Sequence, residues 1–176
     1  VTLTSGRVIF NHTASDYVFA PSIRTSSGSG QREVQHLSGT TTVSSLANFR
    51  GNTMISGGTL KVQSSLSNFG LVGIGEDGTF ELQAPNEEYL SIGSVFSGTG
   101  ALVKSGEGVA IFSGASPDFT GSTTVSAGTM QLATGSSLSS SEIAIDGGLL
   151  QVNATALDDA ADVDISSGGL ELQGSE

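Results

Sequence analysis

The stretch Gly121-Ser-Thr-Thr-Val-Ser-Ala-Gly-Thr-Met-Gln-Leu132 decides the fold, because related stretches recur along the chain at a nearly constant interval. Each consists of a strand that alternates polar and apolar residues, a glycine, and a second alternating strand. The second strands begin at Gly58, Gly78, Gly108, Gly128, Gly148 and Gly168, which are evenly spaced except between Gly78 and Gly108. A period of about 20 residues is too short for a pair of helices and fits a solenoid of short strands.

Within each unit the alternation has a period of two, so that Leu150 and Val152 face one way and Gln151 the other. A third, looser apolar segment follows each pair of strands. The pattern therefore predicts an all-β parallel β-helix with about 20 residues and three short strands per coil. We expect like residues to stack in buried columns, formed by Leu60, Val62, Phe80, Leu82, Met130, Leu132, Leu150, Val152, Leu170 and Leu172. The residues between them are expected to be exposed, namely Lys61, Glu81, Gln131, Gln151 and Glu171.

Composition supports the all-β class and excludes several kinds of site. The chain of 176 residues contains 25 glycines and 13% charged residues, which argues against helical bundles and charge-rich disorder. It has no cysteine, so disulfides and thiolate metal sites are excluded. A net charge of −11, with few and scattered basic residues, argues against nucleic acid as a partner.

A larger repeat is superimposed on the short one. Phe49, Gly51, Thr53 and Gly58 each recur after one common interval, as Phe119, Gly121, Thr123 and Gly128. We call this interval, which separates Thr53 from Thr123, the repeat offset, and a tandem duplication explains it. We predict a single β-helix fragment over residues 1–176, made of two large repeats, about 6–69 and 78–138, and two further coils over 139–176.

The short period is interrupted in two segments, Asn11 to Ile23 and Ala84 to Val95. We expect each to form an extra strand or an outward excursion, packed down by Tyr17 or Tyr89. Ile74 is also one position out of step with its counterparts.

A resemblance to a known family rests on a long stretch of the second large repeat. The stretch reads Gly98-Thr-Gly-Ala-Leu-Val-Lys-Ser-Gly-Glu-Gly-Val-Ala-Ile-Phe-Ser-Gly-Ala-Ser-Pro-Asp-Phe-Thr-Gly-Ser-Thr-Thr-Val-Ser-Ala-Gly-Thr-Met. It strongly resembles the passenger-associated repeat of bacterial type V (type Va) autotransporters. The first copy is similar through Gly6-Arg-Val-Ile-Phe-Asn-His-Thr, Gly28-Ser-Gly and Phe49-Arg-Gly-Asn-Thr-Met-Ile-Ser-Gly-Gly-Thr-Leu.

This resemblance implies a right-handed parallel β-helix that is exported unfolded through the outer membrane and displayed on a Gram-negative cell. The chain departs from the family at Ala110, where a large aliphatic residue is usual, and at Pro117-Asp118, which replaces an Asn-containing turn before Phe119. These departures concern local coil packing rather than membership of the family.

Several groups of residues are candidate functional sites. Asp158, Asp159, Asp162 and Asp164, near Asp146, could bind calcium or supply the carboxylates of a polysaccharide-cleaving enzyme. Alternation favours a solvated turn, with Asp162 and Asp164 on the outer face. Gly73-Ile-Gly75-Glu-Asp77 resembles a calcium-binding nonapeptide only once, and we interpret it as a turn.

The two histidines and the sequons are also interpreted as structural or incidental. His12 and His36 have no cysteine or acidic neighbour at a metal-ligand spacing. Asn11-His-Thr13 and Asn153-Ala-Thr155 fit the eukaryotic glycosylation sequon, which is incidental in a bacterial surface protein. No serine lies in a Gly-x-Ser-x-Gly context or beside a paired histidine. We therefore predict no catalytic, cofactor-binding or metal-ligating residue, and no cofactor.

The favoured function is a non-enzymatic surface scaffold that mediates adhesion, self-association or biofilm formation. A stalk that presents a distal functional domain and, less favoured, a polysaccharide-active β-helix enzyme are the alternatives. The expected partners are a host cell surface or matrix, or another copy of the chain in autoaggregation. Membrane contact is expected only through a barrel domain outside this chain, and localisation at the bacterial cell surface.

Overall fold

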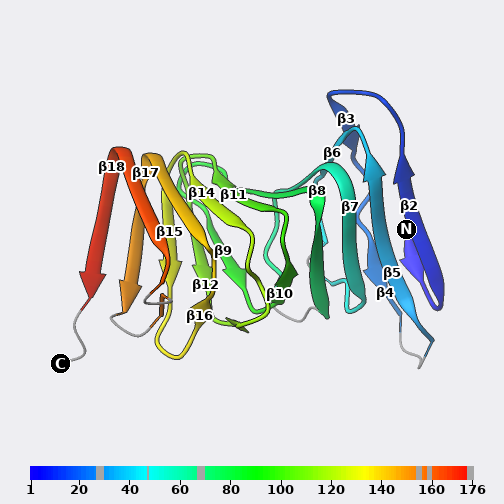
Figure 1. The fold of residues 1–176 in the computed structure, drawn as a ribbon. Coiled ribbons are helices and arrows are strands. Elements are labelled where there is room, and N and C mark those ends of the chain that lie inside the picture. The colour runs from blue at the N-terminus through cyan, green and yellow to red at the C-terminus, as the bar shows by residue number, and fades with distance from the viewer. Residues whose placement is uncertain (27–29, 47, 67–69, 154–155, 158–159, 174–176) are drawn as a thin grey trace.

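A computed structural model describes residues 1–26, 30–46, 48–66, 70–153, 156–157 and 160–173. The described residues form strands and connecting turns, and all strand pairs are parallel. The strands stack as a β-solenoid of about eight turns, roughly 20 residues apart, which confirms the predicted fold class. The N-terminus lies towards one end of the stack and the C-terminus towards the other (Figure 1). None of the described residues forms a helix long and apolar enough to cross a membrane.

Strand pairing divides each coil into three faces. The first face carries β2 (Gly6–Asn11), β5 (Arg32–Ser38), the first halves of β7 (Asn52–Val62) and β8 (Leu71–Gln83), and β10 (Val95–Gly98). The second face carries β3 (Tyr17–Phe19), β6 (Thr40–Val43), the second halves of β7 and β8, β11 (Ala101–Ser105), β14 (Ser122–Val125), and the first halves of β17 (Glu142–Asn153) and β18 (Asp162–Gln173).

The third face carries β9 (Tyr89–Ile92), β12 (Val109–Phe112), β15 (Thr129–Leu132), and the second halves of β17 and β18. Two short pairs complete the coils. They are β1 (Thr2–Leu3) with β4 (Arg24–Thr25), and β13 (Ala115–Ser116) with β16 (Ser137–Leu138). The segments Asn11 to Ile23 and Ala84 to Val95 thus contain regular strands of the stack, β3 and β9. The tyrosines do not pack these strands down as expected, because Tyr17 and Tyr89 are exposed at the surface.

The predicted columns are confirmed over most of the solenoid. Leu60 pairs with Phe80, and Met130 pairs with Leu150, which pairs in turn with Leu170. Eight of the ten residues expected in the core are buried: Leu60, Val62, Phe80, Leu82, Met130, Leu132, Leu150 and Val152. Period-two alternation combined with the short repeat period is therefore sufficient to find the core.

The burial prediction is wrong at the last coil and for most of the outward residues. Leu170 is partly buried and Leu172 is 68% exposed, because β18 is the last described strand and no described coil covers it. Lys61, Glu81, Gln131 and Gln151 are partly buried rather than exposed, and only Glu171 is exposed as expected. Outward side chains stack on their neighbours in adjacent coils about 4.8 Å away, which removes part of their surface from water.

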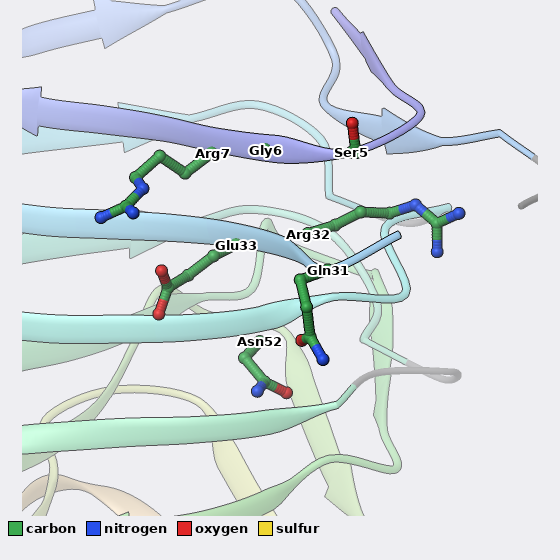
Figure 2. Close-up of a pocket in the computed structure, with 7 residues that line it drawn as sticks. All are labelled: Ser5, Gly6, Arg7, Gln31, Arg32, Glu33 and Asn52. Carbon is green, nitrogen blue, oxygen red and sulfur yellow. The ribbon is translucent and has the colours of Figure 1, made fainter. Parts of the chain in front are cut away.

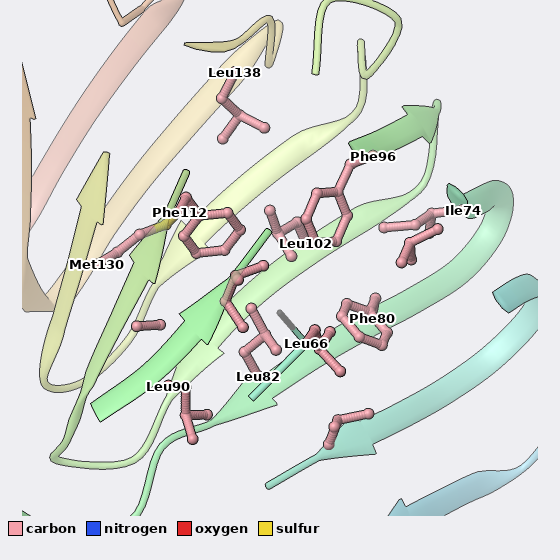
Figure 3. Packing of buried hydrophobic residues seen from close by; sticks show 14 of the residues in the cluster. Leu66, Ile74, Phe80, Leu82, Leu90, Phe96, Leu102, Phe112, Met130 and Leu138 are labelled. Carbon is pink, nitrogen blue, oxygen red and sulfur yellow. The ribbon is translucent and has the colours of Figure 1, made fainter. Parts of the chain in front are cut away.

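Aromatic packing fills the middle of the solenoid. The Phe96 ring lies 5.8 Å from Phe80, 5.6 Å from Phe112 and 6.4 Å from Phe119, measured between ring centroids. Figure 3 shows Phe80, Phe96 and Phe112 converging in the core from different strands. Since these residues belong to the second, first and third faces, the aromatic cluster ties the three faces together.

Ile74 is aligned with its counterpart in the neighbouring coil because the strand pairing is irregular at a corner. It is buried and pairs with Ile55, whereas the next paired residues are Gly57 and Asp77. Between these pairs, two residues of β8 oppose one residue of β7, which absorbs the extra position.

Glycine is required at the equivalent corners Gly58 and Gly128. Their φ angles are 70° and 60°, a left-handed conformation that other residues adopt at a cost. A Cβ at either position would also collide with a backbone carbonyl oxygen of the preceding coil, that of Gly39 or Gly108. The glycines that define the short period in the sequence are therefore corners of the coil.

The two copies of the large repeat lie on different faces. In the first copy, Thr53 lies on the first face and Leu60 on the second. Their counterparts Thr123 and Met130 lie on the second and third faces. The repeat offset thus corresponds to three coils and one additional face. The second copy is consequently rotated by one face relative to the first.

Candidate functional site

The acidic residues near the C-terminal end do not converge on a site in the described part of the chain. Asp162 and Asp164 are exposed on β18, and Asp146 Oδ1 accepts a 2.8 Å hydrogen bond from Ser166 Oγ. Asp158 and Asp159 lie outside the described residues. Among the residues that are described, no group of three His, Cys, Asp or Glu side chains could hold a metal ion. Calcium binding and carboxylate catalysis gain no geometric support from these residues.

Two other candidates from the sequence lie in strands or at their ends. Gly73 to Asp77 contain the corner inside β8, where the register shifts, and Glu76 and Asp77 are exposed; the turn expected here is therefore part of a continuous strand. Asn11 is exposed at the end of β2, where its side-chain oxygen accepts a hydrogen bond from Ser38 Oγ at 2.9 Å. In the second sequon, Ala154 and Thr155 lie outside the described residues.

The two histidines meet at Thr41 near the N-terminal end of the solenoid. His12 Nε2 lies 2.8 Å and His36 Nε2 lies 3.1 Å from the Thr41 hydroxyl, and His36 Nδ1 lies 2.9 Å from the Gly57 carbonyl oxygen. Their ring centroids are 6.2 Å apart. The fold thus joins residues of three successive coils that are far apart in the sequence.

Hydrogen-bond geometry assigns the tautomers of this cluster. Because a carbonyl oxygen can only accept, His36 Nδ1 must donate, and in neutral His36 the bare Nε2 accepts from the Thr41 hydroxyl. The Thr41 oxygen then accepts from His12 Nε2–H, and His12 Nδ1 is buried with no partner in the described part of the chain. Burial lowers the pKa of His36, the bond to Gly57 opposes this, and the neighbouring His12 lowers it further. The cluster is therefore a hydrogen-bonded chain that connects coils.

A buried lysine occupies the core of the second copy. Lys104 is 0% exposed, and its Nζ donates to the carbonyl oxygens of Ser105, Gly106 and Ala127 at 3.0, 2.7 and 2.9 Å. Burial lowers its pKa to about 8, while Glu107 acts in the opposite direction. All three N–H donors of the ammonium are satisfied by corner carbonyls, so the side chain is engaged in structure and closed to a ligand.

Two shallow polar hollows lie on the outer surface of the first coils. The first has a volume of about 320 Å³ and is lined by Ser5, Gly6, Arg7, Gln31, Arg32, Glu33 and Asn52 (Figure 2). The second has a volume of about 430 Å³ and is lined by Arg24, Thr25, Ser26, Asn48 and Arg50. Each contains two arginines, whereas the chain has six basic residues in all. These hollows are the candidate binding site.

The gathering of arginines was missed by sequence reasoning, which treated the basic residues as scattered. A signal existed, because all four arginines occur within residues 1–50, where only two residues are acidic. Arg7, Arg24, Arg32 and Arg50 are unevenly spaced, however, and match no single strand pattern. Only the coiling of the chain brings them onto neighbouring outer surfaces.

Two segments of the solenoid match a known family of repeats. Residues 38–62 and 102–132 each match the passenger-associated-transport-repeat. The first segment runs from the end of β5 to the end of β7, and the second from β11 to the end of β15. No curated protein and no solved structure matches the chain.

Ala110 and Pro117-Asp118, where the chain departs from the repeat pattern, are accommodated without interrupting the stack. Ala110 is buried and pairs with Leu90 and Met130, while Pro117 and Asp118 are exposed before the buried Phe119. Both departures are local, as expected.

Proposed function

Because the chain carries two passenger-associated-transport repeats on a β-solenoid, as an autotransporter passenger does, we propose that it is a surface-displayed scaffold that mediates adhesion, self-association or biofilm formation. The repeat family implies export to the cell surface. The proposed role is non-enzymatic, in keeping with a family that consists mainly of scaffolds.

The observation that carries this proposal is the division between inward and outward residues. Most inward positions are occupied by the apolar columns. Buried polar side chains such as Lys104 form hydrogen bonds within the fold. Residues free to meet a partner are therefore those of the outer surface. A partner would be contacted along the length of the solenoid rather than in a deep cavity.

The outer surface is suited to many weak polar contacts. Side chains from adjacent coils form short ladders, in which Lys61 Nζ lies 3.0 Å from Glu81 Oε2, Gln63 Nε2 donates to Gln83 Oε1 at 2.7 Å, and Gln151 Nε2 donates to Glu171 Oε2 at 2.8 Å. Such ladders hold polar groups in a regular array. Display of many copies on one cell would convert weak contacts into adhesion through avidity.

The test displays the chain on a non-adherent bacterium and recodes one face at a time. Thr42→Lys with Thr124→Lys alters the second face, and Gln131→Lys with Gln151→Lys alters the third. Settling of cells and attachment to a surface are compared with the unmodified chain at equal display, measured with an antibody. At least one face is expected to reduce settling or attachment when it is recoded.

Two outcomes would replace this proposal. If all faces can be recoded without any change in settling or attachment, the chain is a stalk that presents another domain. If the purified chain releases reducing ends from a polysaccharide and loses this activity on Asp162→Asn or Asp164→Asn, it is an enzyme.

A further inference from the structure

Charge is distributed very unevenly along the solenoid. Residues 1–50 contain four arginines and two acidic residues, a net charge of +2, whereas residues 51–176 contain two lysines and 15 acidic residues, a net charge of −13. One of those two lysines, Lys104, is buried. The first coils are therefore the part of this acidic chain that can attract an anion.

One arginine of each hollow is anchored on the same N-terminal segment. Arg24 Nε donates to Thr2 Oγ1 at 3.0 Å, and Arg32 Nε donates to the Thr4 carbonyl oxygen at 3.2 Å. These anchoring points are two residues apart on one segment, or about 7 Å at the rise of an extended chain. Arg32 of the first hollow and Arg24 of the second are therefore held by neighbouring residues, on the same end of the solenoid.

Most of this positive charge is not neutralised by the protein. Within the described residues, Arg7, Arg24 and Arg50 have no carboxylate close enough for an ion pair. Glu33 is the carboxylate that lines the first hollow, and it accepts a 2.8 Å hydrogen bond from Gln35 Nε2. Guanidinium groups with unused N–H donors are suited to bidentate binding of an oxyanion. Figure 2 shows the Arg7 and Arg32 side chains extending in opposite directions beside the hollow.

The other lining groups indicate the class of ligand. Gln31, Asn48 and Asn52 supply amides, and Thr25 and Ser26 supply hydroxyls, all able to bind sugar hydroxyl groups. None of the described residues that line the hollows is aromatic, so these residues offer no surface for stacking nucleobases. None of the described lining residues has an apolar side chain that would pack against a lipid chain. A chain of sugars that carry anionic groups fits all of these features.

We propose that the outer surface formed by Arg7, Arg24, Arg32 and Arg50 binds an anionic polysaccharide, through sulfate or carboxylate groups held by the arginines and sugar hydroxyls held by the amides. This inference rests on the proposed role in adhesion and names its ligand class. The remaining negative charge restricts binding to the first coils. At physiological ionic strength it acts only weakly on the arginines, because charges more than about 8 Å apart are largely screened.

The experiment measures binding of fluorescent polysaccharides to the purified chain. Dextran sulfate and polygalacturonate supply sulfate and carboxylate groups, and uncharged dextran of equal length is the control for dextran sulfate. At least one anionic polymer should bind and dextran should not. The logarithm of the association constant should fall with the logarithm of salt concentration, with a slope that corresponds to about two to four neutralised charges.

Single substitutions make the assignment specific. Arg7→Gln and Arg50→Gln should each weaken binding about tenfold, and Glu33→Gln should strengthen it severalfold because it removes a competing carboxylate. Lys61→Gln is the matched control, since it removes one positive charge from a different face and should leave binding unchanged. Circular dichroism confirms that each variant is folded, so that weaker binding reports the site.

Several results would overturn the proposal. They are the absence of binding to both anionic polymers, equal binding to uncharged dextran, or an effect of Lys61→Gln as large as that of Arg7→Gln. Tighter binding to a single-stranded oligonucleotide would assign the surface to nucleic acid. Arginine-dependent self-association without polysaccharide binding would assign it to a second copy of the chain.

The two proposals fail in different ways. If the displayed chain promotes adhesion but the purified chain binds no anionic polymer, the polysaccharide inference fails and the adhesive role stands. If the purified chain binds through its arginines but the displayed chain causes neither attachment nor settling, the polysaccharide site stands and the adhesive role fails.

Discussion

The two copies of the repeat bury different polar side chains at the same position of the repeat. In the first copy, Val34 and His36 of β5 pair with Thr53 and Ile55. In the second copy, Leu102 and Lys104 of β11 pair with Thr123 and Val125, which lie one repeat offset beyond Thr53 and Ile55. His36 and Lys104 are therefore structurally equivalent.

Both side chains donate to the same backbone position. His36 Nδ1 donates to the carbonyl oxygen of Gly57, and Lys104 Nζ donates to that of Ala127, again one repeat offset further on. Two different buried side chains thus supply a hydrogen-bond donor to the same carbonyl oxygen of the repeat.

The difference lies in how the rest of each side chain is satisfied. Lys104 uses its two further donors on the corner carbonyls of Ser105 and Gly106, so its contacts stay with the corners around β11. His36 instead binds Thr41, which connects it to His12 in the preceding coil. The second copy is closed on itself, whereas the first depends on a hydrogen-bonded chain that reaches the end of the solenoid.

Removing the Lys104 side chain should have the largest effect on stability. Lys104→Ala leaves a cavity in the column between Leu82 and Val125 and removes the hydrogen bonds that Nζ donates to three carbonyl groups, of which that of Ser105 still accepts from the Ala84 N–H. We expect the free energy of unfolding to fall by about 2 to 5 kcal/mol in urea denaturation. Lys61→Ala, which removes a half-exposed lysine, should cost no more than about 1 kcal/mol. Equal costs would show that Lys104 is not part of the core.

Alkaline pH provides the second test of the lysine. The pKa of Lys104 is lowered to about 8 in the folded chain from an ordinary value of 10.5, so between these values the unfolded chain binds more protons. Stability contributed by this group should therefore rise with pH across that window, by about 3 kcal/mol. Lys104→Met removes the titrating group and should show a smaller rise in urea midpoint between pH 8 and 10.5. Parallel curves for the two proteins would contradict the assignment.

Much of this comparison could be predicted from the sequence, and part could not. The alternation in Ala101-Leu-Val-Lys104 places Lys104 on the same side as Leu102, and the spacing places Leu150 above Met130. The carbonyl acceptors that make a buried lysine tolerable belong partly to other segments, and local periodicity contains no information about them. The repeat offset is not a whole number of short periods, and this mismatch indicates that the second copy is rotated relative to the first.

The candidate site could not be predicted from local sequence patterns either. The arginines became a surface only when residues 7 and 32, and residues 24 and 50, were brought together by coiling. The exposure of Leu172 could not be predicted from its own repeat, because burial of this side chain depends on a following coil. The buried columns can thus be predicted from local sequence patterns. The arginine hollows and the exposure of the last coil cannot, because they depend on contacts between distant segments.

Acid should act on the first copy only. Burial lowers the pKa of His36 below its ordinary value of 6.5, so the unfolded chain binds more protons as the pH falls below 6.5. Stability should decrease through this range until the folded pKa is passed, and the decrease should be smaller in His36→Gln. Hydrogen exchange provides the measurement, because amides of β5 and β6 should lose protection before those of β11 and β14. Uniform loss of protection along the solenoid would exclude a local effect of His36.

The smallest expected difference between the copies concerns a threonine hydroxyl. Thr123 Oγ1 lies 2.5 Å from Ser140 Oγ, whereas Thr53 Oγ1 is buried with no partner among the described residues, and Gly70 stands at the position equivalent to Ser140. Thr123→Val should cost about 1 kcal/mol, since it also leaves the Ser140 hydroxyl unpaired.

Thr53→Val should instead be neutral or stabilising by up to about 1 kcal/mol, because it removes an unsatisfied buried hydroxyl from a site of nearly the same shape. Urea midpoints of the two variants give the comparison, and a double-mutant cycle of Thr123→Val with Ser140→Ala isolates the hydroxyl pair. A coupling energy near zero would mean that the pair contributes nothing. If both valine variants are destabilised equally, the shared packing at this position matters more than the hydrogen bond that distinguishes the two copies.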